Sequence, residues 1–322
     1  MKSLKADLDS GKGKVVYHTY ISAIEQYLKP FFGKHNIDSI TPKLLAKFDE
    51  WRLKKLRRTP AASTITNHNS SLNRVFKYAH MHGWLTRDSI PALTNKGKKG
   101  QARPAFTLDE YTILVRKMPA WCKSGHTAKT RDMRELLRDY VLILANTGIR
   151  HGTEAQSLKW RNIDSITKDG ERYLRFTVDG KTGNRTLIPR VNVDEYLKRI
   201  QSRFPDLAKL TFDQLVKAKK DVNVFRLRDG SITKNLNQSF RQLMRDTKLE
   251  YGATSDLART LYSLRHTYAT FALKSGIGIH ELAKQMGTSV KMIEAHYSKI
   301  TPELLADTFA GRRYGKTAVS IR

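Results

Sequence analysis

The sequence predicts a mainly α-helical protein with a small β-hairpin or sheet, divided into two domains. Three observations lead to this prediction. Residues 16–82 carry apolar side chains at three- and four-residue steps, the period of amphipathic helices. Residues 95–104 are rich in Lys and Gly and lack an apolar period, as a linker does. Residues 172–188 alternate between apolar and polar side chains around a turn, which is typical of a hairpin.

Length and charge narrow the class of protein. A chain of 322 residues can bury two cores, and no apolar run is long enough to span a bilayer or to act as a secretory signal, so we expect a cytoplasmic protein. Its 59 Lys and Arg against 30 Asp and Glu give a net charge of +29, which indicates a polyanionic partner. Residues 1–100 alone hold 19 basic and 7 acidic residues, so both domains are basic. This distribution favours two domains that close on DNA from two sides, and hence a nucleoid-associated protein. The single Cys122 excludes an internal disulfide, and we expect neither a metal nor a cofactor.

The first domain is predicted to be a helical bundle. Residues 1–14 have no apolar period and are expected to be a flexible lead-in. A helix then runs from Val16 to about Gly33, and a second is capped by Thr41 and opened by Pro42. A third extends from about residue 63 to residue 82 and stops at Gly83.

Two segments of this domain are candidates for DNA contact. The basic run 52–58 closes the second helix, where it is either a solvated helix end favoured by the dipole or a contact with DNA. The third helix begins with small hydrogen-bonding side chains, which suit phosphates and base edges. The candidates, including two lysines of the linker, are Arg52, Lys54, Lys55, Arg57, Arg58, Thr64, Thr66, Asn67, Asn69, Lys98 and Lys99.

The second domain is predicted to open with a capping box formed by Thr107 and Glu110. A long helix over 130–146 ends at Gly148, and Arg150 follows on a turn into a short helix. Further elements are expected as strands over 172–178 and 185–188 with a turn over 179–184, and as helices near 193–203 and 233–247.

Three short helices are expected near the carboxyl end. The first opens near Ser263 and closes at Gly276, the second spans 279–286, and the third runs from Ser289 to about Tyr297. Arg265 and His266 would lie in the first turn of the first helix, where free N–H groups favour a phosphate. Thr301 and Pro302 begin one more helix, and a basic tail follows residue 311. Spacing alone assigns no chemistry to these residues.

Three sequence blocks together resemble the tyrosine recombinases, the phage integrase family. S-L-R-H-T-Y-A-T (263–270), then M-G-T-S (286–289), then Tyr297 nine residues after Thr288 resembles the second signature block of that family. N-T-G-I-R-H-G-T-E-A (146–155) resembles its first block, and V-D-G-K-T-G-N-R-T-L-I-P-R (178–190) resembles the hairpin that carries its catalytic lysine. The blocks occur in the family's order.

The resemblance implies a fold and a reaction. It implies a helical core-binding domain over 1–94, a mobile basic linker over 95–106 and a mixed α/β catalytic domain with a tail over 107–322. The activity would be site-specific recombination of DNA through a covalent 3′-phosphotyrosyl intermediate. In this reaction Arg150 and Arg265 would hold the phosphate, Tyr297 would attack it, Lys181 would protonate the leaving 5′-oxygen, and His266 would assist.

The resemblance also implies partners. These are a double-stranded DNA recombination site, a tetramer of this chain on two sites, a tail that docks on a neighbouring protomer, and accessory proteins that bend DNA or set direction.

Three positions depart from the family pattern. Tyr262 stands where the family most often has His, and Thr288 stands where His or Trp is frequent; both are hydroxyls that can hydrogen-bond a phosphate oxygen. Glu154 lies four residues after Arg150 rather than three. Two alternatives stay open. A type IB topoisomerase would use the same chemistry and relax DNA without requiring a particular sequence, and the residues at 262 and 288 leave room for a non-catalytic DNA-binding relative.

Overall fold

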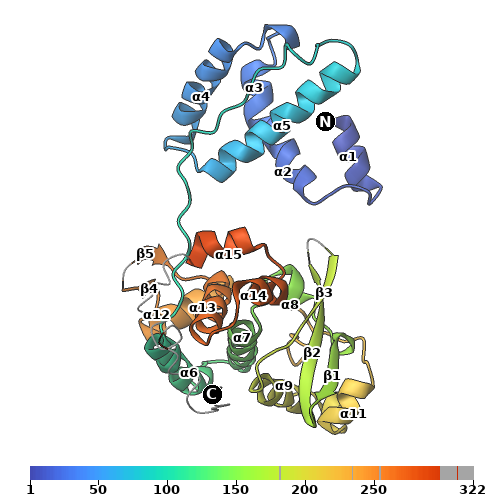
Figure 1. The fold of residues 1–322 in the computed structure, drawn as a ribbon, viewed down its shortest axis with the longest axis vertical. Coiled ribbons are helices and arrows are strands. Elements are labelled where there is room, and N and C mark those ends of the chain that lie inside the picture. The colour runs from blue at the N-terminus through green and yellow to red at the C-terminus, as the bar shows by residue number, and fades with distance from the viewer. Residues whose placement is uncertain (181–182, 234, 254, 298–309, 311–322) are drawn as a thin grey trace, which may run out of the picture. The chain divides into compact units, whose positions relative to one another are not determined.

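The computed structural model describes residues 1–180, 183–233, 235–253, 255–297 and 310, and it contains two compact units, residues 1–101 and 102–322 (Figure 1). Most of the described residues are helical, and the strands form small antiparallel sheets. The predicted fold class is therefore confirmed. None of the helices in this described part combines the length and the apolar character that crossing a membrane requires.

The first unit is a helical bundle around an aromatic core. The rings of Phe31, Phe32, Phe48 and Trp51 pack against one another with centroids 4.8 to 6.0 Å apart. Its elements are α1 Lys2–Asp9, α2 Val16–Ala23, the π turn Ile24–Leu28, α3 Lys29–Phe32, the 3₁₀ turn Ile37–Ser39, α4 Pro42–Leu56 and α5 Ala62–Met81.

The predicted helix boundaries of this unit hold for α2 to α5. Thr41 caps α4 by accepting a hydrogen bond from the Leu44 N–H, at 3.3 Å. The chain leaves α5 through Gly83, whose φ of +73° favours glycine. The predicted helix over 16–33 is continuous but contains a π turn just before Pro30, which lacks an N–H for the helical ladder.

The predicted flexible lead-in over residues 1–14 is wrong. Residues Lys2–Asp9 form α1, which buries Leu4 and pairs Lys5 with Glu25 of the π turn at 3.0 Å. One buried leucine in eight residues gives too weak an apolar period for the sequence to indicate this helix.

The predicted mobile linker covers residues 95–106. Its first residues bond to the first unit, and its last residues bond to the second unit. Asn95 donates hydrogen bonds to the Ala62 carbonyl at 2.8 Å and to the Thr66 hydroxyl at 2.9 Å. The Ala62 N–H donates to the Lys98 carbonyl at 2.9 Å, and the Lys98 N–H donates to that of Pro60 at the same distance. Residues 95–98 are thus part of the first unit.

The other end of this segment is fixed to the second unit. Arg103 donates to the Ala258 carbonyl at 3.0 Å, and the buried Phe106 donates its N–H to Thr267 at 2.9 Å. The segment between the two sets of contacts is therefore residues 99–102, shorter than the predicted linker, and its mobility stays a prediction.

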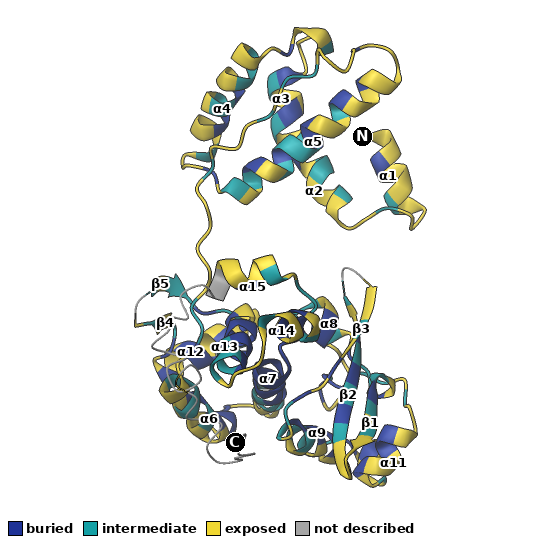
Figure 2. Ribbon diagram, viewed as in Figure 1, coloured by how far each residue is buried: buried dark blue, intermediate teal, exposed yellow. Residues whose placement is uncertain are grey.

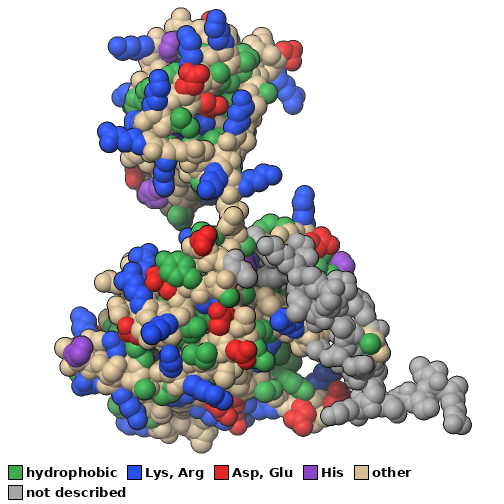
Figure 3. All heavy atoms as spheres, turned by 90° about the vertical axis from the view of Figure 1, so that its left-hand side faces the viewer, with side chains coloured by type: hydrophobic (Ala, Val, Ile, Leu, Met, Phe, Trp, Pro, Cys, Tyr) green, Lys and Arg blue, Asp and Glu red, His purple; other side chains and the backbone are tan. Residues whose placement is uncertain are grey.

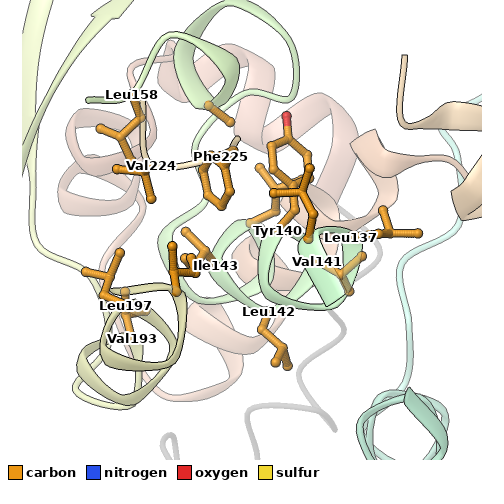
Figure 4. Close-up of a cluster of buried hydrophobic side chains, with 14 of the residues drawn as sticks. Leu137, Tyr140, Val141, Leu142, Ile143, Leu158, Val193, Leu197, Val224 and Phe225 are labelled. Atoms are coloured by element: carbon orange, nitrogen blue, oxygen red, sulfur yellow. The ribbon is translucent and has the colours of Figure 1, made fainter. Parts of the chain in front are cut away.

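The second unit is built around α7, whose carboxyl-terminal part from Leu136 to Thr147 is almost entirely buried (Figure 2). Side chains of α7 pack with Val193 and Leu197 of α9 and with Leu158, Val224 and Phe225 (Figure 4). Its helices are α6 Leu108–Lys123, α7 Ala128–Thr147, α8 Thr153–Gln156, α9 Val193–Ser202, α10 Pro205–Ala208, α11 Phe212–Lys217, α12 Asn237–Thr247, α13 Leu261–Lys274, α14 Ile279–Met286 and α15 Val290–Tyr297, with a 3₁₀ turn at Trp160–Asn162.

A three-stranded antiparallel sheet in the order β1-β2-β3 lies beside these helices (Figure 1). The strands are β1 Ile163–Lys168, β2 Glu171–Gly180 and β3 Gly183–Leu187, and β2 and β3 are the predicted hairpin. The predicted turn over 179–184 is too long, because Asp179 pairs with Asn184 and Gly180 with Gly183. The sequence reading missed β1 and the short hairpin of β4 Tyr251–Gly252 with β5 Ser255–Ala258.

Candidate active site

The turn after α7 positions Arg150. Gly148 ends α7 with a φ of +67°, and a Cβ at this residue would overlap the ring of Tyr268 on α13. The requirement for glycine is therefore both conformational and steric. The Gly148 carbonyl accepts a hydrogen bond from the Arg265 guanidinium, so this turn joins the first sequence block to the second.

Helix α13 presents Arg265 from its second turn. The helix begins at Leu261, with Thr260 and Ser263 forming the capping box, two residues before the predicted start. Arg265 is consequently the fifth helical residue, beyond the N–H groups that a helix leaves unpaired. The predicted phosphate site on free N–H groups around Arg265 and His266 is wrong, and it is the guanidinium side chain that offers donors.

Three arginines donate hydrogen bonds to three successive carbonyls at the carboxyl end of α14. Arg185 of β3 donates to the Gln285 carbonyl at 2.6 Å, and Arg265 donates to that of Met286 at 2.6 Å. Arg150 donates to the carbonyl of Gly287. Because a helix ends in negative partial charge, this arrangement stabilises cations that would otherwise repel one another. We call Arg150, Arg185 and Arg265 the arginine group.

One buried carboxylate joins two members of the arginine group. Glu154, whose side chain is 0% exposed, pairs with Arg150 and, at 2.7 Å, with Arg185. Burial alone would raise the pKa of Glu154, but the hydrogen bond from the Arg150 N–H and the charges of both arginines lower it below its usual value. Glu154 is therefore ionised at neutral pH, and its spacing of four residues from Arg150 still allows direct pairing.

Arg265 is the most deeply buried cation of this group. Burial, followed by the nearby charge of Arg150, lowers the pKa of its guanidinium to about 10. Arg265 remains charged at neutral pH, although Glu154 pairs with Arg150 and Arg185 and not with Arg265. Such a concentration of forked donors is suited to an oxyanion like a phosphodiester.

The residues predicted to assist catalysis line a hollow beside Arg265. It is lined by Tyr262, Arg265, His266 and Thr288, together with apolar side chains of α14 and α15. Tyr262 is 44% exposed, and its ring meets that of His266 edge to face at 5.1 Å. The structure thus brings Tyr262, His266 and Thr288 to one place.

The nucleophile and the general acid are predicted on α15 and on the hairpin of β2 and β3. Helix α15 starts after Ser289, whose hydroxyl accepts from the Met292 N–H at 3.3 Å, and ends at Tyr297, as predicted. The side chain of Tyr297 lies outside the described residues. Lys181, the predicted helix from Thr301 and the tail after residue 311 also lie outside them.

The basic residues predicted to contact DNA from the first unit differ in exposure. Arg52 is 2% exposed, pairs with Asp49 at 2.5 Å and lies over the Phe48 ring, so its assignment as a DNA contact is wrong. Lys55 is exposed but lies over the rings of Tyr27 and Trp51. The other basic candidates are exposed, at the end of α4 and in the segment that follows Asn95: Lys54, Arg57, Arg58, Lys98 and Lys99.

The polar start of α5 is partly used inside the first unit. Thr66 accepts from Asn95, and Asn69 donates to the Thr94 carbonyl at 2.9 Å. Thr64 and Asn67 are partly buried. Hydrogen-bonding side chains that looked suited to DNA therefore also bind Thr94 and Asn95, and periodicity gave no signal for this attachment.

Sequence reasoning assigned no role to Arg185. Its sequence signal is only its position four residues after Lys181 in the hairpin block. The contact with Glu154 spans 31 residues and that with Gln285 spans 100, so neither follows from a local pattern.

Two comparisons with known proteins concern the first unit and the fold of the whole chain. Residues 2–98 match the family model of the phage integrase SAM-like domain. No curated protein sequence matches the chain.

Solved structures of recombinases share the fold over nearly the whole chain. The XerH site-specific recombinase bound to a palindromic difH substrate in a post-cleavage complex has 17% identity and a TM-score of 0.65, covering 92% of this chain and 80% of that one. A lambda integrase tetramer bound to a Holliday junction has 18% identity and a TM-score of 0.58, covering 89% and 76%. The Tn1549 transposon integrase with circular intermediate DNA has 17% identity and a TM-score of 0.59, covering 95% and 98%. Residues 2–98 are thus similar to the phage integrase SAM-like domain, and the chain shares the fold of solved tyrosine recombinases, which confirms the predicted family resemblance.

Proposed function

We propose that this chain is a tyrosine-type site-specific DNA recombinase that cuts and rejoins strands through a covalent 3′-phosphotyrosyl intermediate. The observation that carries the proposal is the meeting of Arg150 and Arg265. These residues come from blocks more than a hundred positions apart, yet both donate to consecutive carbonyls at the end of α14. Neither the fold nor the charge alone would select this chemistry.

The reaction follows from the residue types. Arg150 and Arg265 hold the non-bridging oxygens of a phosphodiester and stabilise the negative charge of the five-coordinate transition state. The Tyr297 oxygen attacks phosphorus and loses its proton, while the bond from phosphorus to the 5′-oxygen breaks. Lys181 supplies the proton that this 5′-oxygen takes up. The new phosphotyrosyl bond keeps the energy of the old one, so a second 5′-hydroxyl can reverse the step without ATP.

The residues of the hollow have assisting roles in this proposal. His266 orients the site or assists proton transfer, and the hydroxyls of Tyr262 and Thr288 donate to phosphate oxygens. Their common position beside Arg265 supports these roles.

The partners follow from charge and from the related complexes. Lys and Arg side chains are spread over the displayed faces of both units (Figure 3), in line with the net charge of +29. We propose that a core-binding domain over 1–94 and a catalytic domain over 107–322 grip one duplex. The lambda integrase tetramer supports assembly of four copies on two sites. Accessory DNA-bending or directionality proteins and docking of the tail on a neighbour belong to the same proposal.

Selection from a pool of random duplexes tests the proposal and identifies the target sequence in the same experiment. The bound duplexes are sequenced, resynthesised with a nick that traps cleavage, and incubated with the protein without metal or ATP. We expect a protein–DNA adduct that survives denaturing electrophoresis and depends on the selected sequence.

Other results would point to the alternatives. Relaxation of supercoiled DNA of any sequence would indicate a type IB topoisomerase. Selective binding with no adduct on any nicked duplex would indicate a non-catalytic relative.

A further inference from the structure

Arg185 and Arg150 belong to one closed ring of hydrogen bonds. The Arg150 guanidinium joins Glu154 Oε1 to the Gly287 carbonyl, and the Arg185 guanidinium joins Glu154 Oε2 to the Gln285 carbonyl. Glu154 closes the ring on one side, and the end of α14 closes it on the other. Each arginine therefore uses its fork to connect the same two structures.

The surroundings of Arg185 fix its orientation. Its side chain is 14% exposed, and its Nε is buried without a hydrogen-bond partner among the described residues. A Cβ on Gly287 would overlap this Nε, so the glycine makes room for the guanidinium. Gly287 also has a φ of +62° at the end of α14. The backbone at Gly287 therefore leaves the space that the Arg185 guanidinium fills.

Arg185 does not line the hollow beside Arg265. The hollow's described lining comes from α13, from α14 and α15 and from Thr288 between them, whereas Arg185 approaches the carboxyl end of α14 from β3. Its two terminal nitrogens already donate to a carbonyl and a carboxylate. Its contacts thus place it against the partners of Arg150.

We propose that Arg185 is a positioning residue, which sets the guanidinium of Arg150 through Glu154 and through the end of α14. Without it, Glu154 keeps Arg150 as its one charged partner and can rotate with it, and the end of α14 loses one of its three bound cations. The consequence for catalysis rests on the proposed function. A misplacement of about 1 Å in such a site costs on the order of a hundredfold in rate.

The first test observes Arg150 directly and needs no DNA. The full chain is labelled with ¹⁵N-arginine, and the Arg150 side-chain signals are assigned by their loss in Arg150→Lys. In Arg185→Met, which keeps the length of the stem but not the fork, we expect a shifted Arg150 signal. We also expect guanidinium rotation about tenfold faster, as follows from weakening a hydrogen bond to a charged group.

Arg175→Met is the matched control. Arg175 lies on the neighbouring strand β2, its side chain is 43% exposed, and its ion pair with Asp164 is long at 3.6 Å. This variant also removes an arginine from the sheet, but it leaves the ring around Arg150 intact. We expect its Arg150 signals to match those of the wild type.

The second test measures rate and binding separately on the selected nicked duplex. For Arg185→Met we expect adduct formation about 10- to 100-fold slower, with affinity for the duplex within about threefold of wild type. Arg185→Lys keeps the charge but has one nitrogen, which cannot reach the carbonyl and the carboxylate as a fork does. Its rate should lie between those of wild type and Arg185→Met. If Arg185 only stabilised the fold, its replacement would lower the fraction of active protein. The rate per active molecule would then be the same in wild type, Arg185→Lys and Arg185→Met.

The outcomes separate the two proposals. Unchanged Arg150 signals in Arg185→Met overturn the positioning role, whatever the enzymatic result. If Arg185→Met does not fold, Arg185→Lys and Glu154→Gln are measured in its place, and wild-type Arg150 signals in both overturn the role equally. No adduct with wild-type protein would contradict the proposed function, while the signals of Arg150 would still decide the role of Arg185.

Discussion

The arginine group of the second unit and the basic end of α4 in the first unit use the same kinds of residue in different ways. Arg150, Arg185 and Arg265 are held by named carbonyls and one buried carboxylate. Lys54, Arg57 and Arg58 are exposed at the end of a helix. Fixed donors can stabilise a transition state of defined geometry, whereas exposed charges contribute attraction that depends on salt. The first region should therefore control rate, and the second should control binding.

Arg265→Lys tests the arginine group most sharply, because it removes a fixed donor and keeps the charge. Lysine keeps the charge but cannot donate at once to the Gly148 and Met286 carbonyls and to a phosphate. Adduct formation on the selected nicked duplex should fall by about a thousandfold or more, with affinity changed only a few-fold.

Arg245→Lys on α12 is the control for this variant, because the Arg245 side chain is 62% exposed. It should retain the wild-type rate. Loss of affinity in Arg265→Lys in proportion to the loss of rate would remove the distinction between the two regions.

Lys181→Ala tests the general acid. We expect cleavage to slow by about two to four powers of ten while binding stays near normal. A duplex with sulfur in place of the leaving 5′-oxygen needs less protonation and should restore much of the rate. A defect of equal size on both duplexes would refute this role for Lys181.

Replacing Lys54, Arg57 and Arg58 together by Gln tests the other side of the comparison. If each residue contacts one phosphate, the slope of log affinity against log salt should become less steep by up to about three. The rate of cleavage at saturating protein should stay the same. Arg52→Met, at a buried position, should lower stability and leave the salt slope unchanged.

The smallest effect concerns His68, a buried residue of α5. Burial and then the charge of Arg52 lower the pKa of His68 to about 4, whereas an unfolded histidine has a pKa of about 6.5. Between these values the unfolded chain binds a proton that the folded chain does not, so stability falls as pH drops from 6.5 toward 4. His68→Asn should reduce this loss in thermal unfolding measured across the range. The exposed His18→Asn serves as control, and an identical pH dependence in both variants would contradict the assignment.

Local signals in the sequence identified much of this structure. The Thr107–Glu110 capping box, the end of α7 at Gly148 and the boundaries of α14 agree with the prediction. Caps and glycines act within a few residues of themselves, so their effect can be recognised without the rest of the fold.

The elements that were missed lack such signals. Strand β1 is Ile163–Lys168, a largely polar sequence at the edge of the sheet with one fully buried residue. The attachment of Asn95 to α5 and the pairing of Arg185 with Glu154 join residues about thirty positions apart. Arg52 was misassigned because a basic run does not show which of its members faces the core. These features depend on tertiary packing, which a local pattern does not contain.

The central claim is that Tyr297 attacks the phosphate that Arg150 and Arg265 hold. Tyr262 is the competing hydroxyl, since it lies in the hollow beside Arg265 and is 44% exposed. Tyr262→Phe should slow cleavage and leave the adduct at Tyr297, and Tyr297→Phe should abolish the adduct while binding persists.

Mass spectrometry of the peptide that carries the trapped nucleotide tests this claim most directly. The measurement uses wild-type protein, the selected nicked duplex and protease digestion of the covalent complex. The account predicts a single modified peptide, which contains Tyr297. A modified peptide that contains Tyr262 in place of Tyr297 would contradict it.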